Sequence, residues 1–377
     1  MKKALIHDWY YVNGGAEKVI HSFNKIWDDF DHFALVDFLK EDDRDYILNG
    51  KSVNTSFVQN LPTAKSNHRK FLQLFPYAIE QFDLSEYDLV LSSSASIAKG
   101  VLTNQNQLHI CYCHSPMRYA WDLYHQYLNA SSFGIIKRIY AKRTLHKIRM
   151  WDVLNSNRVD LFIANSHYIK GRIKKIYNRD AEVIYPPVDV NQFQLQKKKH
   201  DYYFTASRMV PYKKIELIVR AFNNLPNKKL IVAGDGPEYK KIKAIAKSNI
   251  HLTGFLDTAE LKTYMADAKA FVFAAEEDFG IIPVEAQACG TPVIAYNKGG
   301  IRETVINRKT GLLFSHQTEK SIIDAISEFE TLELDPVSIR QNAMRFSKER
   351  FEKEIGDYVN EQYKNFIAHK KSLHQSY

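Results

Sequence analysis

Residues 270–296 read AFVFAAEEDFGIIPVEAQACGTPVIAY, and this stretch decides the fold that the sequence predicts. Ala270 to Ala275 is a short apolar run of the kind that forms a buried strand, and acidic residues end it. Pro283 stands in the first turn of a helix, where a missing N–H is tolerated, and Gly290 ends that helix. A second apolar strand follows over Val293 to Tyr296. The pattern is strand, turn, helix, strand, and open α/β sheets bind ligands at such a turn.

The turn in this stretch offers an anion site with a carboxylate on each side. Its donors are the backbone N–H groups of Gly280, Ile281 and Ile282. They lie at the start of a helix, where the helix dipole favours negative charge. Glu277 precedes them in the loop and Glu285 follows them in the first turn of the helix, and carboxylates accept hydrogen bonds from hydroxyls. Two glutamates at this spacing are most often solvated surface residues, but the glycines and prolines around them favour a nucleotide-sugar site.

Length and composition limit the class of protein. A chain of 377 residues is expected to form two domains, and 45% hydrophobic with 25% charged residues is typical of a folded, soluble chain. Three cysteines are too few for a disulfide framework, which favours a reducing compartment. Only three apolar residues follow Lys2 and Lys3, too few for a signal peptide, and no apolar run reaches about 18 residues. We therefore expect a cytoplasmic protein.

The net charge is +9, and two basic clusters lie in the first half of the chain. Between Lys137 and Arg179 there are twelve Lys or Arg residues against two acidic ones, Asp152 and Asp160. A second basic cluster consists of Lys65, His68, Arg69 and Lys70. Such surfaces bind nucleic acid, anionic membranes or acidic small molecules. We do not expect nucleic acid as a partner, because no aromatic platform or known nucleic-acid motif accompanies the charge.

Short apolar runs alternate with helical patterns along the whole chain, which predicts α/β domains with doubly wound parallel sheets. The runs predicted as strands in the first half are Ala4 to Ile6, His32 to Val36, Asp88 to Leu91, Leu108 to Cys113, Leu161 to Ala164 and Val183 to Tyr185. Those in the second half are Tyr202 to Ala206, Leu230 to Ala233, Ile250 to Thr253, Ala270 to Ala275 and Val293 to Tyr296. We expect domains over residues 1–190 and 200–350, and a terminal helix over residues 351–377.

The stretch from Glu277 to Ala295 resembles the E-x7-E motif of family 4 retaining glycosyltransferases, which have the GT-B fold. The resemblance implies two Rossmann-like domains whose parallel sheets face a central cleft, with a C-terminal helix crossing back to the first domain. It implies that Glu285 binds the donor ribose and that Glu277 acts in catalysis at the donor sugar hydroxyls. It places Phe279 and the turn's N–H groups against the donor, and it requires no metal and no cofactor.

Basic residues follow the first predicted strand of the second domain. Arg208 and Lys213 flank a turn there, and such residues suit a diphosphate, because arginine binds it in a bidentate manner and lysine adds a point charge. The pair resembles the family's R-[LM]-x-x-x-K motif, which implies that both neutralise the leaving diphosphate. Lys214 departs from the glycine often found at that position, which puts the shape of the turn in doubt. Gly254 and Phe255 match the place where family members hold the nucleobase.

Two segments of the first half also resemble the family. Gly14 and Gly15 close a strand-to-helix loop, and although most glycine pairs are plain turns, this one resembles the G-G-A-E-[RK]-V signature whose loop faces donor and acceptor. Cys-His-Ser-Pro-Met-Arg at residues 113–118 resembles the [CT]-H-[ST]-P-x-R segment of members that transfer mannose. That resemblance implies that His114 lies beside the donor sugar and takes part in catalysis. Alternation of Cys111 and Cys113 along a strand argues against a metal site.

The function implied is transfer of a sugar from a nucleotide diphosphate to a hydroxyl with retention of configuration. The segments around His7-Asp8-Trp9 and His114 look most like GDP-mannose enzymes, and UDP-sugars stay open. A growing, lipid-linked saccharide or another oligosaccharide is the expected acceptor, as in bacterial surface polysaccharide assembly. Two alternatives remain: a sugar-nucleotide epimerase of the same fold, and a non-catalytic protein that binds nucleotides or nucleic acid.

Residues 133–151 predict a basic amphipathic helix. Apolar Ile135, Ile139, Leu145 and Ile148 fall near one side, and six Lys or Arg residues surround them. A solvated helix face explains the pattern as well as a function does. The functional interpretation is a cationic surface that lies on the anionic inner leaflet of the plasma membrane, which would make the protein peripheral there.

Overall fold

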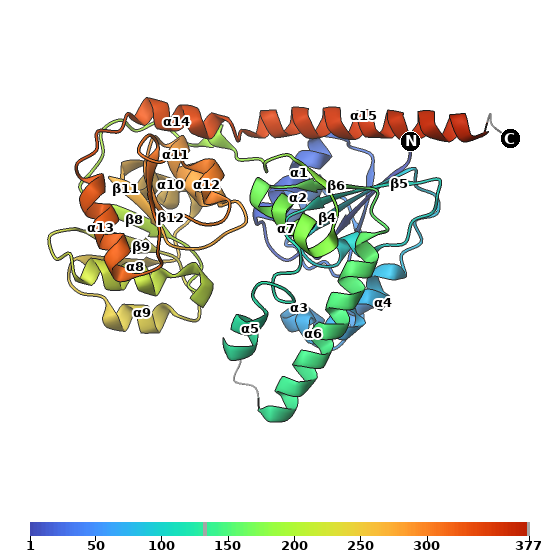
Figure 1. Ribbon diagram of the computed structural model, residues 1–377, viewed down its shortest axis with the longest axis horizontal. Coiled ribbons are helices and arrows are strands. Elements are labelled where there is room, and N and C mark those ends of the chain that lie inside the picture. Colours follow the sequence, from blue (N-terminus) through green and yellow to red (C-terminus); the bar gives the residue numbers. More distant parts are fainter. Residues whose placement is uncertain (131–133, 375–377) are drawn as a thin grey trace. The chain divides into compact units, whose positions relative to one another are not determined.

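The computed structural model describes residues 1–130 and 134–374, which form two compact units (Figure 1). Unit 1 runs from Met1 to Pro187 and resumes at Phe351, and unit 2 runs from Val188 to Arg350. The polar tract of residues 191–201 belongs to unit 2. Phe133 and residues 375–377, which the sequence analysis placed in helices, lie outside the described residues.

Unit 1 is built on a parallel sheet in the order β3-β2-β1-β4-β5-β6-β7, which has seven strands among the described residues. The strands are β1 (Lys3–His7), β2 (Phe30–Ala34), β3 (Val53–Thr55), β4 (Leu89–Ser94), β5 (Leu108–Cys113), β6 (Leu161–Ala164) and β7 (Ala181–Val183). The helices are α1 (Gly15–Ile26), α2 (Glu41–Leu48), α3 (Ala64–Asn67), α4 (Phe75–Glu80), α5 (Tyr124–Ala130), α6 (Ile135–Ser156) and α7 (His167–Tyr177), with α15 (Lys348–His374) closing the chain.

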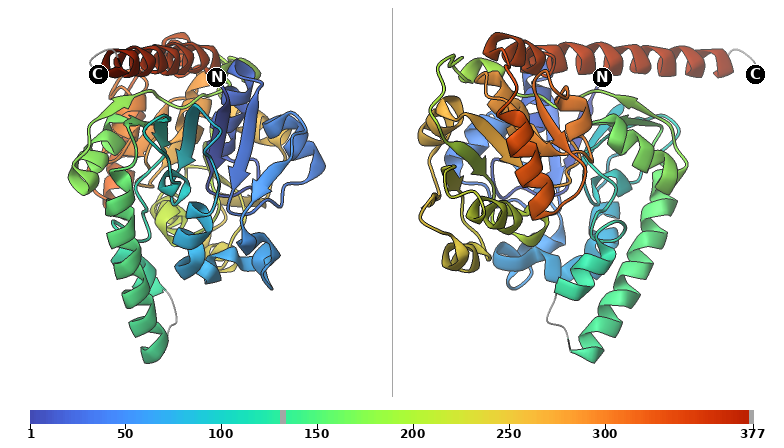
Figure 2. Two further views of the ribbon diagram at one scale, coloured as in Figure 1. Left: turned by 90° about the vertical axis from the view of Figure 1, so that its right-hand side faces the viewer. Right: turned by 60° about the vertical axis from the view of Figure 1, so that its left-hand side comes forward.

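Side chains of β1 alternate between two cores, as the pleat of a strand requires. Ala4 and Ile6 pack with residues of α4 and α6 on one face of the sheet. Leu5 packs on the other face with α1, α2 and the first turns of α15, whose Phe351 and Ile355 are fully buried. The later turns of α15 continue along unit 1 in the views of Figures 1 and 2.

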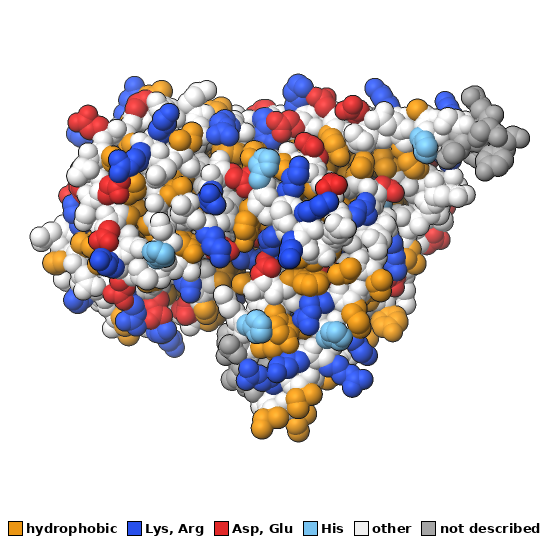
Figure 3. Space-filling view, in the orientation of Figure 1, with side chains coloured by type: hydrophobic (Ala, Val, Ile, Leu, Met, Phe, Trp, Pro, Cys, Tyr) orange, Lys and Arg blue, Asp and Glu red, His pale blue; other side chains and the backbone are white. Residues whose placement is uncertain are grey.

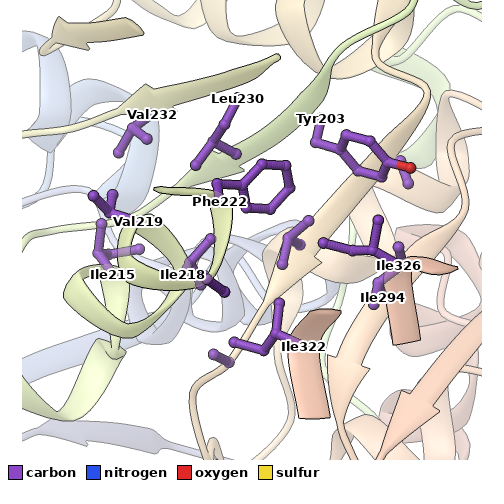
Figure 4. Close-up of a cluster of buried hydrophobic side chains, with 14 of the residues drawn as sticks. Tyr203, Ile215, Ile218, Val219, Phe222, Leu230, Val232, Ile294, Ile322 and Ile326 are labelled. Atoms are coloured by element: carbon purple, nitrogen blue, oxygen red, sulfur yellow. The ribbon is translucent and has the colours of Figure 1, made fainter. Parts of the chain in front are cut away.

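Unit 2, all of whose residues are described, contains a six-stranded parallel sheet in the order β10-β9-β8-β11-β12-β13. The strands are β8 (Tyr203–Ala206), β9 (Leu230–Ala233), β10 (Ile250–Gly254), β11 (Ala270–Phe273), β12 (Val293–Tyr296) and β13 (Gly311–Phe314). The helices are α8 (Ile215–Asn223), α9 (Tyr239–Ile245), α10 (Thr258–Asp267), α11 (Ile281–Ala288), α12 (Ile301–Thr304), α13 (Glu319–Phe329) and α14 (Pro336–Met344). Figure 4 shows its core, where Phe222 of α8, Ile326 of α13 and Tyr203 of β8 meet. The predicted doubly wound parallel sheets are confirmed in both units.

Helix α6 does not have the single apolar side that was predicted for it. Leu145 and Ile148 are buried, but Ile135 and Ile139 are 80% and 62% exposed, so the four residues do not share one packed face. The reason is that the first turns of α6 project beyond the rest of unit 1 (Figures 1 and 2) and find no core to cover. Among the described residues, no helix is both long enough and apolar enough to cross a membrane.

Candidate functional site

The central stretch forms the turn between β11 and α11 at the carboxyl end of the unit 2 sheet. Gly280 adopts a φ of +88° as the N-cap of α11, a conformation that glycine takes without strain. The helix begins at Ile281, two residues before Pro283, so Glu285 lies in its second turn and not in the first. No described residue accepts a hydrogen bond from the N–H groups of Gly280, Ile281 or Ile282. These donors remain available to an anion.

Lys213 and Glu277 form an ion pair across neighbouring strands. Lys213 ends a short 3-10 helix after β8, and Glu277 follows β11, the strand next to β8 in the sheet. Each side chain is only 19% exposed. Parallel strands thus bring together the residue expected to bind the diphosphate and the residue expected to bind the sugar.

Backbone contacts hold the Glu277 loop in place. The Gly300 N–H donates to the carbonyl of Glu277 at 2.9 Å. A Cβ added at Gly300 would lie 2.4 Å from the carbonyl oxygen of Asp278, and one at Gly299 would lie 2.3 Å from that of Glu277. Glycine is therefore required at both positions, because any side chain there would clash with the backbone of the Glu277 loop and displace it.

Arg208 lies on the same edge of the sheet and is exposed, with no ion-pair partner among the described residues. Its loop rests on the loop after β9, where Met209 N–H donates to the carbonyl of Asp235 at 2.8 Å. A Cβ at Gly234 would lie 2.0 Å from the carbonyl of Ser207. No role was predicted for Gly234 and Gly236, although a Gly-x-Gly directly after a strand is a signal for such a close backbone approach.

The other predicted site residues of unit 2 differ in their exposure and in what packs against them. Gly254 ends β10 with a φ of +76° and open space around it, and the ring of Phe255 beside it is 82% exposed. Glu285 is 7% exposed. Phe279 is buried with its ring against Phe346, at a centroid distance of 5.4 Å. The Phe279 side chain therefore packs inside unit 2 below the loop, and only the Phe279 backbone is placed to contact a ligand.

Lys214 shows how the chain tolerates its departure from glycine. The residue has φ +59° and ψ +28°, the left-handed conformation that glycine adopts freely. The turn thus keeps the shape that a glycine would give it, at the cost of strain on a lysine backbone.

In unit 1 the glycine pair forms the start of α1. Gly14 is its N-cap and Gly15 its first residue. The Glu17 carboxylate accepts a hydrogen bond from the Gly14 N–H at 3.1 Å, and its other oxygen lies 3.6 Å from Nε2 of the buried His7. Glu17 is the glutamate of the G-G-A-E-[RK]-V signature, and no role was predicted for it from the sequence.

His114 directly follows β5 and is half-buried. Its Nε2 lies 2.7 Å from Oγ of Ser93, and its carbonyl accepts from Asn165 at 2.9 Å. Burial, aided by the nearby His7, lowers the pKa of His114 to about 3. The imidazole is therefore neutral at physiological pH.

Basic and apolar residues stand together on the projecting end of α6. Residues 134–140 are all exposed, and Figure 3 shows hydrophobic and basic side chains together on this end. Asp152, one of the two acids in the basic segment, is fully buried and paired with Lys99, so it does not reduce the surface charge. Among the described residues, no group of three His, Cys, Asp or Glu side chains is arranged to hold a metal ion.

Comparison with known proteins identifies both units. A model described as Glycosyltransferase Family 4 matches residues 13–192, and one described as Glycosyl transferases group 1 matches residues 188–346. An uncharacterized glycosyltransferase of Methanocaldococcus jannaschii is 31% identical over 227 residues, covering 59% of this chain and 62% of that protein. A GDP-mannose-dependent α-(1-6)-phosphatidylinositol monomannoside mannosyltransferase of Mycobacterium tuberculosis is 28% identical over 194 residues, covering 43% of this chain and 50% of that protein. The chain thus spans less than two thirds of the length of these two relatives.

The fold has close structural counterparts. The crystal structure of Anabaena HepE in complex with UDP and glucose superposes with a TM-score of 0.66 at 20% identity, covering 96% of this chain and all of that one. At that identity the likeness concerns the fold alone. With both halves matched by glycosyltransferase models, the chain belongs to the family 4, group 1 glycosyltransferases, and its two units are the Rossmann-like domains of the GT-B fold.

Proposed function

We propose that the protein transfers a sugar, with retention of configuration, from a nucleotide diphosphate donor to a hydroxyl group. The observation that carries the proposal is the edge of the unit 2 sheet after β8 and β11. There the Lys213–Glu277 ion pair, exposed Arg208 and the unbonded N–H groups at the start of α11 lie on adjacent loops. Unit 2 is the proposed donor-binding domain, and unit 1 the proposed acceptor-binding domain.

The chemistry follows from where charge develops. As the bond from the sugar to the diphosphate breaks, negative charge grows on the leaving phosphate, and cations and fixed N–H donors stabilise it. Arg208, Lys213 and the N–H groups of Gly280 to Ile282 are the proposed donors. Glu285 accepts from the ribose hydroxyls and Glu277 from those of the sugar, and no step requires a metal or a cofactor.

Gly14, Gly15 and His114 are the proposed contributions of unit 1. The lack of side chains at the glycine pair allows a saccharide to come close to the backbone. Neutral His114 cannot supply a positive charge near pH 7. Its proposed role is to position the donor sugar through a hydrogen bond.

GDP-mannose is the favoured donor. The Cys-His-Ser-Pro-Met-Arg segment resembles mannose-transferring members, and the M. tuberculosis relative is named as GDP-mannose-dependent. UDP-sugars remain the alternative, since structural counterparts such as Anabaena HepE were solved with UDP. The exposed Phe255 offers a flat apolar face that suits a nucleobase of either kind.

The proposed acceptor is a lipid-linked saccharide, reached by binding of unit 1 to the anionic inner face of the plasma membrane. Exposed Ile135, Ile136 and Ile139 stand among basic side chains on α6, which is the composition of a surface that enters the headgroup region. Vesicles rich in phosphatidylglycerol should sediment the wild type and not an Ile135→Asp/Ile139→Asp variant. Leu154→Asp changes an equally exposed residue at the other end of α6 and should leave binding intact.

A donor screen tests the enzymatic proposal. The purified protein would be incubated with GDP-mannose and the common UDP-sugars, with and without EDTA, and released nucleotide followed by chromatography. Slow release from one donor, unaffected by EDTA and lost in Glu285→Ala, would support it. Glu276→Gln alters the neighbouring carboxylate, which pairs with Lys298, and should retain the release. No release and no thermal shift with any donor or nucleotide would favour the non-catalytic alternative, and epimerised donor without transfer would favour the epimerase.

A further inference from the structure

Four polar side chains form a connected series through the interior of unit 1, and His114 is the last of them. The series joins Glu17 of α1, His7 of β1, Ser93 of β4 and His114 after β5. His7 Nε2 lies 3.6 Å from the Glu17 carboxylate, and its Nδ1 lies 3.1 Å from the carbonyl oxygen and 3.2 Å from Oγ of Ser93. Ser93 Oγ lies 2.7 Å from Nε2 of His114. His7, Glu17 and Ser93 are 3%, 7% and 0% exposed.

The hydrogen positions in this series follow from what each atom can do. The Ser93 carbonyl can only accept, so Nδ1 of His7 must carry a hydrogen. The Ser93 hydroxyl oxygen, at 3.2 Å from the same nitrogen, shares that hydrogen as an acceptor. Its own hydrogen is then free to be donated.

Among the described residues, Nε2 of His114 is the only remaining partner for the Ser93 hydroxyl hydrogen. If Nε2 carried a hydrogen instead, the buried hydroxyl would have no acceptor, which is costly for a polar group without contact to water. Nε2 therefore accepts, and a neutral His114 carries its hydrogen on Nδ1. No described residue accepts from that Nδ1.

We infer that Ser93 is a positioning residue that fixes His114 in the Nδ1–H form, so that His114 offers a hydrogen-bond donor to an oxygen of the substrate sugar. This rests on the proposed function for the identity of the ligand, but not for the state of the imidazole. His114 then acts neither as a base through Nε2 nor as a cation, since Nε2 is occupied and the ring is neutral.

His7 lies on the other side of Ser93 from His114 and stabilises this hydrogen-bond arrangement. The carboxylates of Glu17 and Asp8 and the Ser93 carbonyl hold its pKa above the ordinary value although burial acts in the opposite direction. The other titratable groups near it are Tyr10, whose ring centroid lies 4.8 Å from that of His7, His32, whose pKa burial lowers to about 3, and His114 itself. The Nδ1–H of His7 is directed at Ser93, and a positive charge on His7 disfavours a second one on His114.

The direct test is nitrogen NMR of the protein with ¹⁵N-labelled histidine at pH 7, with the His114 signals assigned by their loss in His114→Gln. The wild type should show a protonated Nδ1 and an unprotonated Nε2 for His114. A protonated Nε2 would overturn the inference without any further variant.

Variants of Ser93 provide a second test of the inference. Ser93→Ala removes the donor, and the His114 signals should shift toward a mixture of both neutral forms, whereas Ser93→Thr keeps the hydroxyl and should restore the Nδ1–H signals. Unchanged His114 signals in a folded Ser93→Ala protein would refute the role of Ser93. With an active donor, Ser93→Ala should lower kcat about three- to tenfold with KM nearly unchanged, and Ser93→Thr should recover it. The NMR needs no substrate, so failure of the proposed transferase function would leave its result standing.

Discussion

The buried ion pair between Lys99 and Asp152 gives a sharp test of how unit 1 is held together. Lys99 follows β4 and Asp152 lies on α6, and their side chains are 2% and 0% exposed. Asp152 also accepts hydrogen bonds from Trp121 at 2.8 Å and from Tyr177 at 2.9 Å. The carboxylate keeps the pKa of Lys99 above its ordinary value, although burial alone would lower it. The pair therefore fastens α6 to the segment that follows Ser93.

Asp152→Asn keeps an amide oxygen for Trp121 or Tyr177 but removes the charge opposite Lys99. The ammonium then keeps only uncharged partners among the described residues, the carbonyl of Ser96 at 3.2 Å and the ring of Tyr177 at 5.2 Å from its centroid. Breaking a buried pair in this way costs about 3–5 kcal/mol. A domain is stable by about 5–15 kcal/mol, so the change removes a large share of that free energy. For a unit of this size each kcal/mol shifts Tm by about 2–4 °C, so we expect a loss of roughly 6–20 °C.

The assay can be confined to unit 1, because all four tryptophans of the chain, Trp9, Trp27, Trp121 and Trp151, belong to it. Urea unfolding followed by tryptophan fluorescence therefore reports its free energy of unfolding separately from unit 2. The double variant Lys99→Met/Asp152→Asn removes both charges and should recover most of the loss. Asp180→Asn breaks the exposed pair with Lys174 and should change stability by about 0.5 kcal/mol at most. A loss below about 1 kcal/mol in Asp152→Asn, or additive effects of Lys99→Met and Asp152→Asn, would refute the reasoning.

Four further outcomes are expected. Burial lowers the pKa of His32 to about 3, so the unfolded chain gains a proton below about pH 6.5 that the native protein does not, and stability falls as pH drops toward 3. His32→Leu should reduce the slope of fluorescence-detected stability against pH by about 1.4 kcal/mol per pH unit between pH 6 and 4, and an unchanged slope would contradict this. Lys214→Gly should stabilise unit 2 by about 0.5–1 kcal/mol in calorimetry by relieving the left-handed backbone; a destabilisation would contradict it. Gly300→Ala should destabilise unit 2 by about 1–3 kcal/mol and abolish donor binding in titration calorimetry, because its Cβ meets the Asp278 and Phe279 backbone at 2.4 and 2.5 Å. Glu277→Gln should bind free GDP or UDP several-fold more tightly than the wild type while losing transfer, because it releases Lys213, and weaker binding would count against that role.

Most helices and strands could be predicted from the sequence, because their ends depend on capping residues and apolar runs within a few positions along the chain. Helix α7 has local signals at both ends, since Ser166 caps its start by accepting from the Ile169 N–H and Asn178 ends it in the left-handed conformation. Short buried strands such as β9 and β12 match the predicted runs, because a continuous apolar run between polar residues has clear ends. The second strand was placed about two residues too late, since β2 includes Phe30 and a polar Asp31 that the apolar pattern did not mark.

The support of the candidate sites could not be predicted in the same way. Glu17, His7, Ser93 and His114 are far apart in the chain and meet only because β1, β4 and β5 are neighbours in the sheet. The exposure of Ile135 likewise depends on how far α6 extends past the core, which periodicity does not encode. By contrast, the edge that joins Lys213 to Glu277 could be anticipated, because both follow predicted strands at their carboxyl ends.

The Lys213–Glu277 pair has a further consequence for selectivity. Each charge is four-fifths buried and has the other as its partner, so neither is left unpaired. A free diphosphate can take Lys213 only by leaving Glu277 without a cation. In the proposed donor site, a nucleotide sugar would provide phosphate for the ammonium and hydroxyls for the carboxylate at once, and so replace both halves of the pair. On this reasoning the ion pair favours a donor with its sugar attached over the product nucleotide, which is the preference that an enzyme needs in order to release its product.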